Sequence, residues 1–342
     1  MNEKCKDLVQ KIEIAESTRL ISYVLADRLS GPGASIAMDA LGLFYRHLEA
    51  IGKVKKIALF LYTTGGDTMV PWRLVNLIRE YCDQFSVLVP YKAHSAGTLV
   101  CLGADEIVMT KMAELSPIDP SVTNAFNPQG PAVPTMPPNV AASIPPVRIP
   151  ISVEDVAAYF KLAKERAGLD TPESRFGALQ QLTNVVHPLA LGNVERSHTM
   201  IRELARKLLS LHMNLKDEAQ SKRCNDIIDT LTEKLYSHQH LIPRREARDI
   251  IGLKVRYPEA YEEDILMDLF AEYKADLGIG GIFNPALELG DRTEMPKEFS
   301  LAKIETTKTE DRFLMRGKIV RASQPNQPPA VNIYDQGWQK TL

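Results

Sequence analysis

Residues 85–98 read FSVLVPYKAHSAGT and join an apolar run directly to a segment of polar and small residues. The run Phe85–Tyr91 has the apolar, β-branched composition of a strand buried on both faces. The small residues of Ala96–Ala104 predict a short helix that begins straight after it. The sequence therefore places Ser95 on the turn between a buried strand and a helix, the repeating unit of parallel sheets flanked by helices.

The same strand-then-helix pattern recurs on both sides of this stretch. Upstream, Lys56–Tyr62 (KIALFLY) predicts a second buried strand, which ends at the sequence TTGGD of residues 63–67. Repeated βα units with short connections predict an α/β protein with a mostly parallel sheet. The other predicted elements are the strands Arg19–Ala26 and Glu106–Thr110 and the helices Ile36–Ile51 and Val70–Cys82.

The chain changes character in its second half. Residues 124–150 contain eight prolines and few charges, which predicts an irregular loop or flap. Strand-like alternation returns late in Phe299–Ala322, and residues 323–342, with QPNQPP, are expected to form a tail. Between the loop and this alternation the sequence predicts helices at Val153–Ala167, Pro172–Leu182, Asn193–Leu211, Asp217–Leu235, Pro243–Ile251 and Tyr257–Leu277.

Composition and charge argue against several classes of protein. The 342 residues carry 41 basic and 43 acidic side chains, a net charge of −2, which gives no electrostatic reason to expect nucleic acid or an anionic membrane as partner. The four cysteines lie far apart without a CxxC pair, as in reduced cytosolic proteins. The N-terminal residues do not resemble a signal peptide, and no stretch approaches the ~18 to 20 apolar residues of a membrane span. A cytoplasmic location without an integral membrane segment is therefore expected.

Two candidate features follow successive strands of this sheet, at the edge where open α/β sheets bind ligands. Ser95 fits a nucleophile exposed at a helix N-terminus, where N–H groups favour developing negative charge. Serine is equally a favoured N-cap, so a purely structural role stays open. The Gly65-Gly66 pair lets backbone N–H groups point into the crevice as an oxyanion hole requires, or simply forms a tight turn.

A serine nucleophile needs a base to take its proton. His94 is adjacent to Ser95 on an extended segment, so its side chain should point to the opposite face, and the other histidines form no metal-ligand pattern. Lysine is the base in some serine enzymes once burial lowers its pKa. Lys161 stands among aromatic and apolar residues in YFKLAK (159–164), which indicates partial burial; a solvated helical lysine is the alternative.

These segments resemble the ClpP-class serine peptidases, most closely the serine dehydrogenase proteinase (SDH_sah) family, relatives of signal peptide peptidase A and the archaeal stomatin-specific protease. The resemblance covers roughly residues 19–256, leaving residues 1–18 as an N-terminal segment and residues 257–322 as a C-terminal extension of helix and strand. It runs through YTTGGDT (62–68), KAHSAGTLVCLGADEIVMTKMAELSPIDPSV (92–122), HPLALGNVERSH (187–198) and LTEKLYSHQHLIPRREARDIIGL (231–253).

The resemblance implies a ClpP/crotonase-like fold with a helix-rich C-terminal part. It also implies an ATP-independent endopeptidase that acts on proteins or peptides without a cofactor or metal. The family pattern places the nucleophile at Ser95, and its backbone oxyanion hole at Gly65, Gly66 and Ala96.

The base is implied by a separate segment. The stretch AYFKLAKERAG (158–168) resembles the helix that carries the lysine base of the stomatin-specific protease, which implies Lys161 as general base and Lys164 as the fallback. Asp119 falls about where the Clp peptidase subunit has its histidine, which argues against a Ser-His-Asp triad. The implied machinery is therefore a Ser-Lys dyad.

Two other functions stay open. The crotonase superfamily uses the same core for acyl-CoA chemistry, so the fold does not by itself establish proteolysis, and an acyl-CoA hydrolase or lyase would not need Ser95. A catalytically silent scaffold subunit, in which Ser95 only caps its helix, is the other alternative. Relatives of this fold often form rings or stacked oligomers, and apolar helix faces between Asn193 and Leu235 fit either a homo-oligomer or packing on the core.

Overall fold

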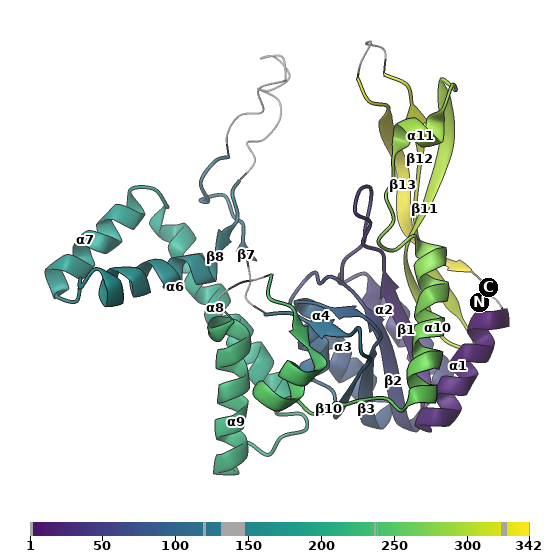
Figure 1. Ribbon diagram of the computed structural model, residues 1–342, viewed down its shortest axis with the longest axis horizontal. Helices are drawn as coiled ribbons and strands as arrows, with labels where there is room; N and C mark the ends of the chain where they lie inside the picture. The colour runs from purple at the N-terminus through teal and green to yellow at the C-terminus, as the bar shows by residue number, and fades with distance from the viewer. Residues whose placement is uncertain are drawn as a thin grey trace.

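The computed structural model describes residues 3–118, 121–130, 148–235, 237, 239–322 and 327–341. These residues form a central eight-stranded sheet in the order β10-β5-β3-β2-β1-β11-β12-β13 (Figure 1). The first five strands in that order run parallel, and β11, β12 and β13 follow antiparallel beyond β1. The predicted α/β class with a mostly parallel sheet is confirmed. The strands are β1 (Arg19–Leu25), β2 (Val54–Tyr62), β3 (Cys82–Val89), β5 (Glu106–Met109), β10 (Val255–Arg256), β11 (Glu294–Glu305), β12 (Glu310–Val320) and β13 (Ala330–Thr341).

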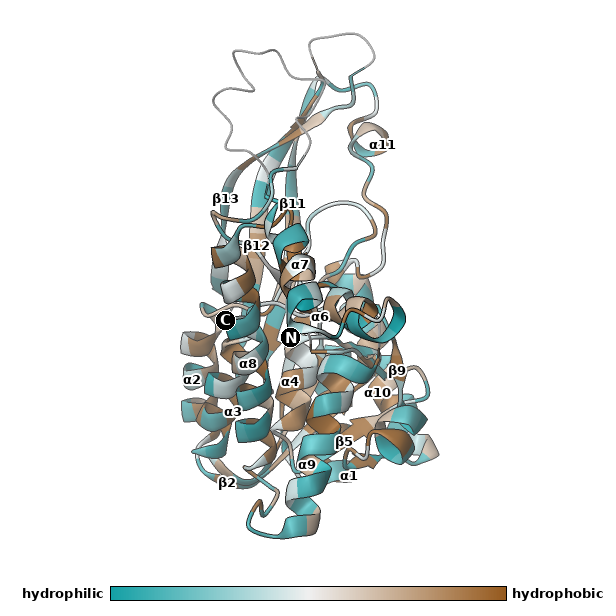
Figure 2. Cartoon of the chain, turned by 90° about the vertical axis from the view of Figure 1, so that its left-hand side faces the viewer, coloured by the Kyte–Doolittle hydropathy of each residue, from teal (hydrophilic) through white to brown (hydrophobic). Residues whose placement is uncertain are grey.

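Helices cover both faces of the parallel strands. On one face α2 (Ala40–Ile51), α3 (Val70–Arg79) and α4 (Ala96–Leu102) share a hydrophobic core with alternate residues of the strands. On the other face α1 (Glu3–Glu16) and α10 (Ala260–Leu277) pack against the strand residues whose side chains point to that face. Because successive side chains of a strand point to opposite faces, strands covered on both sides are apolar throughout. Figure 2 shows hydrophilic and hydrophobic residues on different sides of the helices, with teal on much of their outer surface.

The C-terminal part of the chain belongs to the central sheet. β11 pairs with β1, so that Val24 lies opposite Lys303. The prediction of a tail at residues 323–342 is wrong for residues 330–341, because these residues form β13 along the length of β12. The prolines of QPNQPP and the many polar residues of this edge strand obscure its pattern in the sequence, because an edge strand is largely solvated. The short helix α11 (Pro285–Leu289) precedes β11.

A helical arm projects from this core (Figure 1). It consists of α6 (Val153–Lys161), the π-helical turn η1 (Leu162–Arg166) and α7 (Pro172–Thr183), and it leads into α8 (Pro188–Leu209) and α9 (Glu218–Asp229). α8 and α9 contribute to the core on the α4 face, whereas α6 and α7 bury few side chains. The helices predicted here are found, although α8 begins about one turn earlier than predicted.

Short elements connect these parts. Asp119 lies outside the described residues. Residues 131–147, which make up most of the predicted loop or flap at 124–150, also lie outside them. The short elements are β4 (Lys92–Ala93), β6 (Glu114–Leu115) and β9 (Ile242–Pro243), which form a three-stranded sheet, the paired β7 (Ser121–Val122) and β8 (Ile151–Ser152), and the π-helical turns η2 (Thr230–Lys234) and η3 (Glu246–Ile250).

Candidate active site

The two segments singled out from the sequence meet at the carboxyl ends of the parallel strands. A parallel bridge joins Thr63, after β2, to Ala93, just before Ser95. A methyl group built on Gly65 would lie 3.0 Å from Ser95 Cβ and 3.5 Å from Ser95 Oγ. The structure therefore brings the serine and the Gly65-Gly66 turn into direct contact.

Ser95 has a strained backbone conformation. Its φ of +50° and ψ of −109° lie where residues with a side chain are rarely found. Hydrogen bonds on either side hold this conformation: the His94 N–H donates to Thr63 O (3.1 Å), and the Ser95 N–H donates to Ser116 Oγ (2.8 Å). Strain of this kind costs about 1–3 kcal/mol and persists where the surrounding structure enforces it, as it does at active sites.

The Ser95 hydroxyl does not cap its helix. Ser95 occupies the N-cap position of α4, yet its side chain accepts no capping hydrogen bond. The half-buried side chain also makes no other hydrogen bond within the part of the chain that the structure describes. The capping hydrogen bond that the purely structural alternative calls for is therefore not formed by Ser95. The hydroxyl lies against Gly65 instead.

Two backbone N–H groups at this corner are candidates for binding an oxyanion. The bonds between Ile36 and the glycine turn use the Gly65 carbonyl and the Asp67 N–H (both 2.8 Å), and they leave the Gly66 N–H unused. The Ala96 N–H belongs to the first turn of α4, where N–H groups have no partner within the helix. Among the described residues, neither N–H donates to an acceptor. Two such donors can stabilise the negative charge of a tetrahedral intermediate.

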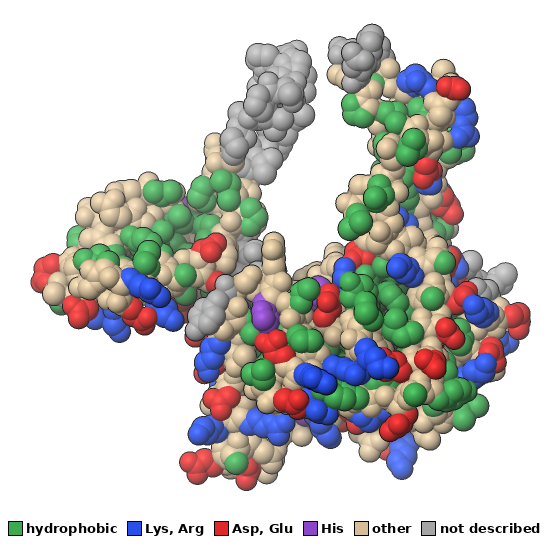
Figure 3. All heavy atoms as spheres, viewed as in Figure 1, with side chains coloured by type: hydrophobic (Ala, Val, Ile, Leu, Met, Phe, Trp, Pro, Cys, Tyr) green, Lys and Arg blue, Asp and Glu red, His purple; other side chains and the backbone are tan. Residues whose placement is uncertain are grey.

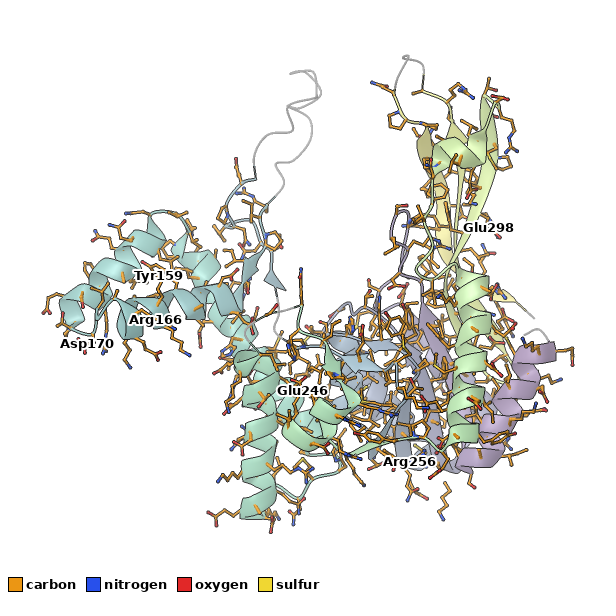
Figure 4. The ribbon with its side chains drawn as sticks, viewed as in Figure 1. Tyr159, Arg166, Asp170, Glu246, Arg256 and Glu298 are labelled. Carbon is orange, nitrogen blue, oxygen red and sulfur yellow. The ribbon has the colours of Figure 1, made fainter. Side chains whose placement is uncertain are left out.

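The structure does not bring the expected lysine base to Ser95. Lys161 and Lys164 are exposed residues of α6 and η1, and α6 packs against α8 and β8. Lys161 and Lys164 stand between Tyr159 and Arg166 in the sequence, and Figure 4 shows that these two labelled residues lie on the projecting arm. The partial burial expected for Lys161 is wrong, because the hydrophobic residues on either side of it are themselves exposed.

The basic side chains of Lys92 and His94 lie near the corner, and both contact carboxylates. Lys92 Nζ is 2.9 Å from Asp27 Oδ2. Burial lowers the pKa of Lys92, but the hydrogen bond and charge of Asp27 outweigh it and raise that pKa above its usual value. His94 Nε2 is 3.2 Å from Glu114 Oε1, and the ring makes no hydrogen bond with the Ser95 hydroxyl. Both side chains are therefore held by carboxylates.

Two residues that support the corner were not predicted from the sequence. Ser116 Oγ accepts the Ser95 N–H and donates to Pro117 O (3.0 Å), while the Ser116 N–H donates to Thr98 Oγ1 (3.2 Å). Both side chains are buried. The one signal in the sequence is that Thr98 is a polar residue inside the otherwise apolar helix AGTLVCL, a placement that requires buried hydrogen-bond partners.

Other kinds of site find little support. Within the described residues no group of three or more His, Cys, Asp or Glu side chains could hold a metal ion. No disulfide joins the four cysteines. None of the helices in the described ranges combines the length and the apolar composition needed to cross a bilayer.

The part of the chain that contains this corner is similar to a known class of protein. A mostly parallel sheet with a serine on a strained strand-to-helix turn is compatible with a ClpP-like serine peptidase. Residues 36–132 match the family model described as ClpP-like SDH-type serine proteinase. This range contains both the Gly65-Gly66 turn and Ser95, so the resemblance inferred from the sequence is confirmed. The arm that carries Lys161 lies beyond it.

Two curated relatives come from Methanocaldococcus jannaschii. The uncharacterized protein MJ0137 is 24% identical over 227 residues, which cover 66% of this chain and 63% of that protein. The uncharacterized protein MJ1495 is 35% identical over 66 residues, which cover 19% of this chain and 23% of that protein. The chain therefore matches less than two thirds of the length of either relative.

Two solved structures are similar at low identity. A membrane-bound stomatin-specific protease is 14% identical, with a TM-score of 0.35 and coverage of 72% of this chain and 81% of that chain. An enoyl-CoA hydratase/isomerase from Marinobacter aquaeolei is 9% identical, with a TM-score of 0.21 and coverage of 59% and 91%.

Proposed function

We propose that the protein is an ATP-independent endopeptidase that cleaves proteins or peptides by means of Ser95 and a backbone oxyanion hole. One observation carries the proposal. The Ser95 hydroxyl stands on a strained turn, does not cap its helix, and lies against Gly65, while the N–H groups of Gly66 and Ala96 donate to no acceptor among the described residues. Strain and unsatisfied donors both cost stability, and acyl transfer gives a reason for keeping them. The proposed compartment is the cytoplasm.

In the proposed reaction Ser95 Oγ attacks the carbonyl carbon of a peptide bond, and its proton passes to a neutral lysine amine. The N–H groups of Gly66 and Ala96 hold the resulting oxyanion, and Gly65 shapes the turn. The C–N bond then breaks as the lysine gives the proton to the leaving amine, which leaves an acyl-enzyme. A water molecule, deprotonated by the same lysine, hydrolyses that ester and restores the serine. Each oxyanion donor is worth about 10²–10³-fold in rate.

Lys161 is the proposed base, with Lys164 as the alternative, and this step needs a rearrangement. Both lysines stand on the arm, so either the arm moves toward α4 or the arm of a second copy approaches the Ser95 corner. In both cases the amine becomes buried when it reaches the serine. Burial favours the neutral amine, the form that a base requires.

Exposed hydrophobic side chains on the arm support a homo-oligomer. Phe176 is 66% exposed, Leu162 57% and Phe160 37%. Figure 3 shows hydrophobic side chains gathered over the arm, at the left of the view. Contiguous apolar surface of this kind is typical of protein interfaces. In such an oligomer a second copy would cover the arm and bury its hydrophobic side chains. The lysine on that arm would then lie at the Ser95 corner of the second copy.

The test is labelling of the purified protein by a fluorophosphonate probe, which reacts with activated serines. We expect the wild type to be labelled, Ser95→Ala to remain unlabelled, and Lys161→Ala to lose most of the labelling. Lys111→Ala, which changes an exposed lysine of the core, is the matched control and should label like the wild type. Labelling that survives in Lys161→Ala but fails in Lys164→Ala assigns the base to Lys164.

A mixing experiment distinguishes the two ways in which the lysine can arrive. Labelling that returns when Ser95→Ala protein is mixed with Lys161→Ala protein shows that the base comes from a second copy. No return shows that it comes from the same chain. A folded wild type that refuses the probe overturns the activated serine, and an acyl-CoA hydrolase or lyase, or a silent scaffold, then becomes the better account.

A further inference from the structure

A cavity of about 230 Å³ opens at the same edge of the sheet as the Ser95 corner. Residues on either side of Ile36 line it, before the start of α2. Ile36 itself bonds to Gly65 O and to the Asp67 N–H. Its segment is therefore the direct neighbour of the proposed oxyanion hole, one strand spacing of about 4.8 Å away.

The floor and walls of the cavity are apolar. Leu301 and Ala302 both line it, because a break in the β11–β12 register between Ser300 and Ala302 interrupts the strict alternation of side chains. Phe313 and Trp338 face each other across β12 and β13, and their rings meet edge to face with centroids 5.5 Å apart and an interplanar angle of 76°. Such an aromatic pair gives the cavity a rigid wall.

Polar groups gather at the mouth. Trp338 Nε1–H donates to Asp39 Oδ2 (3.0 Å), which fixes the indole ring against the start of α2. Ser35 and Gln336 are exposed at the rim. Apolar cavities with a few polar groups at the mouth are the usual form of ligand sites, which for drug-sized ligands span about 300–1,000 Å³. The smaller volume here suits a single large side chain.

We propose that this cavity is a specificity subsite that binds one large apolar side chain, the size of leucine or phenylalanine, from a peptide held at Ser95. The inference rests on the proposed peptidase function. An extended peptide advances about 3.3 Å per residue, so a side chain two or three residues from the scissile bond reaches the cavity. The subsite gives β13 a role in substrate recognition through Trp338, a residue outside the range that matches the family.

Trp338 provides a direct readout, because the chain has two tryptophans and the other is Trp72 in α3. A double variant, Trp72→Phe with Ser95→Ala, isolates the Trp338 emission and prevents turnover. We expect N-acetyl-Ala-Ala-Phe-amide to shift or quench this emission with saturation. The matched peptide with aspartate in place of phenylalanine should bind about 10-fold or more weakly, because the cavity floor offers no partner for a carboxylate.

Two variants change the cavity in opposite directions, and their binding is measured by calorimetry in the Ser95→Ala background. Ala37→Leu fills the cavity and should weaken the phenylalanine peptide about 10-fold while sparing an all-alanine peptide. Trp338→Ala removes a wall and should weaken both the affinity and the preference. Tyr334→Ala, which is 66% exposed on the same strand but outside the cavity, is the matched control and should bind like its parent.

The outcomes separate this proposal from the proposed function. A silent Trp338 emission, or equal affinities for Ala37→Leu and its parent, overturns the subsite even if the fluorophosphonate probe labels Ser95. A saturable response with the expected preference, in a protein whose wild type refuses the probe, supports an apolar binding cavity and overturns the peptidase that was proposed to use it.

Discussion

The turn around Ser95 and the helical arm differ in how many contacts with the rest of the protein hold them in place. Around Ser95, hydrogen bonds to the segments after β2 and β6 hold a strained turn between buried residues. On the arm, α6 buries Val153 and α7 buries Ala178, and a hydrogen bond from Tyr159 to Ala178 O (2.9 Å) links the two helices. The proposed nucleophile thus stands on the rigid core, and the proposed base stands on an element with few contacts. The proposed catalytic geometry therefore depends on a movement of the arm or on the arm of a second copy.

The largest expected difference comes from replacing one glycine in each region by alanine. Gly66 has a φ of +147°, and a methyl group there would lie 2.2 Å from Ile36 O. Backbone cannot move aside as a side chain can, so we expect Gly66→Ala to lower the free energy of unfolding by about 3 kcal/mol or more and to abolish labelling by the probe. Urea unfolding followed by circular dichroism measures the first effect.

Gly177→Ala in α7 is the matched substitution on the arm. Nothing lies within 4 Å of a methyl group at that position. Alanine favours a helix over glycine by about 0.5–1 kcal/mol, so this variant should be as stable as the wild type or slightly more stable. Equal stability of the two variants would contradict the close contact between the glycine turn and Ile36.

The same contrast decides what the sequence could reveal. The corner was predictable because its signals are local: a buried strand, two glycines and a serine before a run of small residues. The position of Lys161 was not, because hydrophobic neighbours look the same whether they face a core or stand exposed on an arm. Ser116 was missed because its contact with Ser95 depends on how the chain folds back. β13 was missed because an edge strand keeps many polar residues.

A smaller difference is expected from two threonines that support these regions. The buried Thr98 hydroxyl lies 2.9 Å from Ala93 O and 3.0 Å from Ser116 O, and it accepts the Ser116 N–H. Thr98→Val keeps the shape but leaves these groups without a partner, at a cost of about 1–3 kcal/mol in the free energy of unfolding. Because Ser116 positions the Ser95 N–H, labelling by the probe should slow as well.

Thr171, the N-cap of α7, is the counterpart on the arm. Its hydroxyl accepts the Ser174 N–H (3.2 Å), and Thr171→Ala should cost about 1 kcal/mol, mostly as local opening of the helix. Hydrogen exchange should therefore speed up in α7 and stay unchanged in α4. Faster exchange in α4 would show that the arm and the corner form one cooperative unit, against the separation inferred from their contacts.

The smallest expected effect is a pH dependence of the free energy of unfolding, which we expect from His212 at the C-terminal end of α4. His212 Nε2–H donates to Leu102 O (2.9 Å), and burial lowers the pKa of the ring below 6.5, although this hydrogen bond and the charge of Asp105 oppose that shift. Arg79 and Lys254 also lower it.

The direction of the pH effect follows from which state binds more protons. Below about pH 6.5 the unfolded chain takes up a proton at His212 that the folded protein resists, so the free energy of unfolding falls as the pH drops, by at most about 1.4 kcal/mol per pH unit. His212→Gln should reduce this slope between pH 7.5 and 5.5, measured by urea unfolding. If the free energy of unfolding has the same pH slope in both proteins, His212 takes up a proton as readily in the folded protein as in the unfolded chain. The C-terminal end of α4 would then be as open to water as the arm. The contrast between the core and the arm would in that case apply to the Ser95 corner and not to the whole of α4.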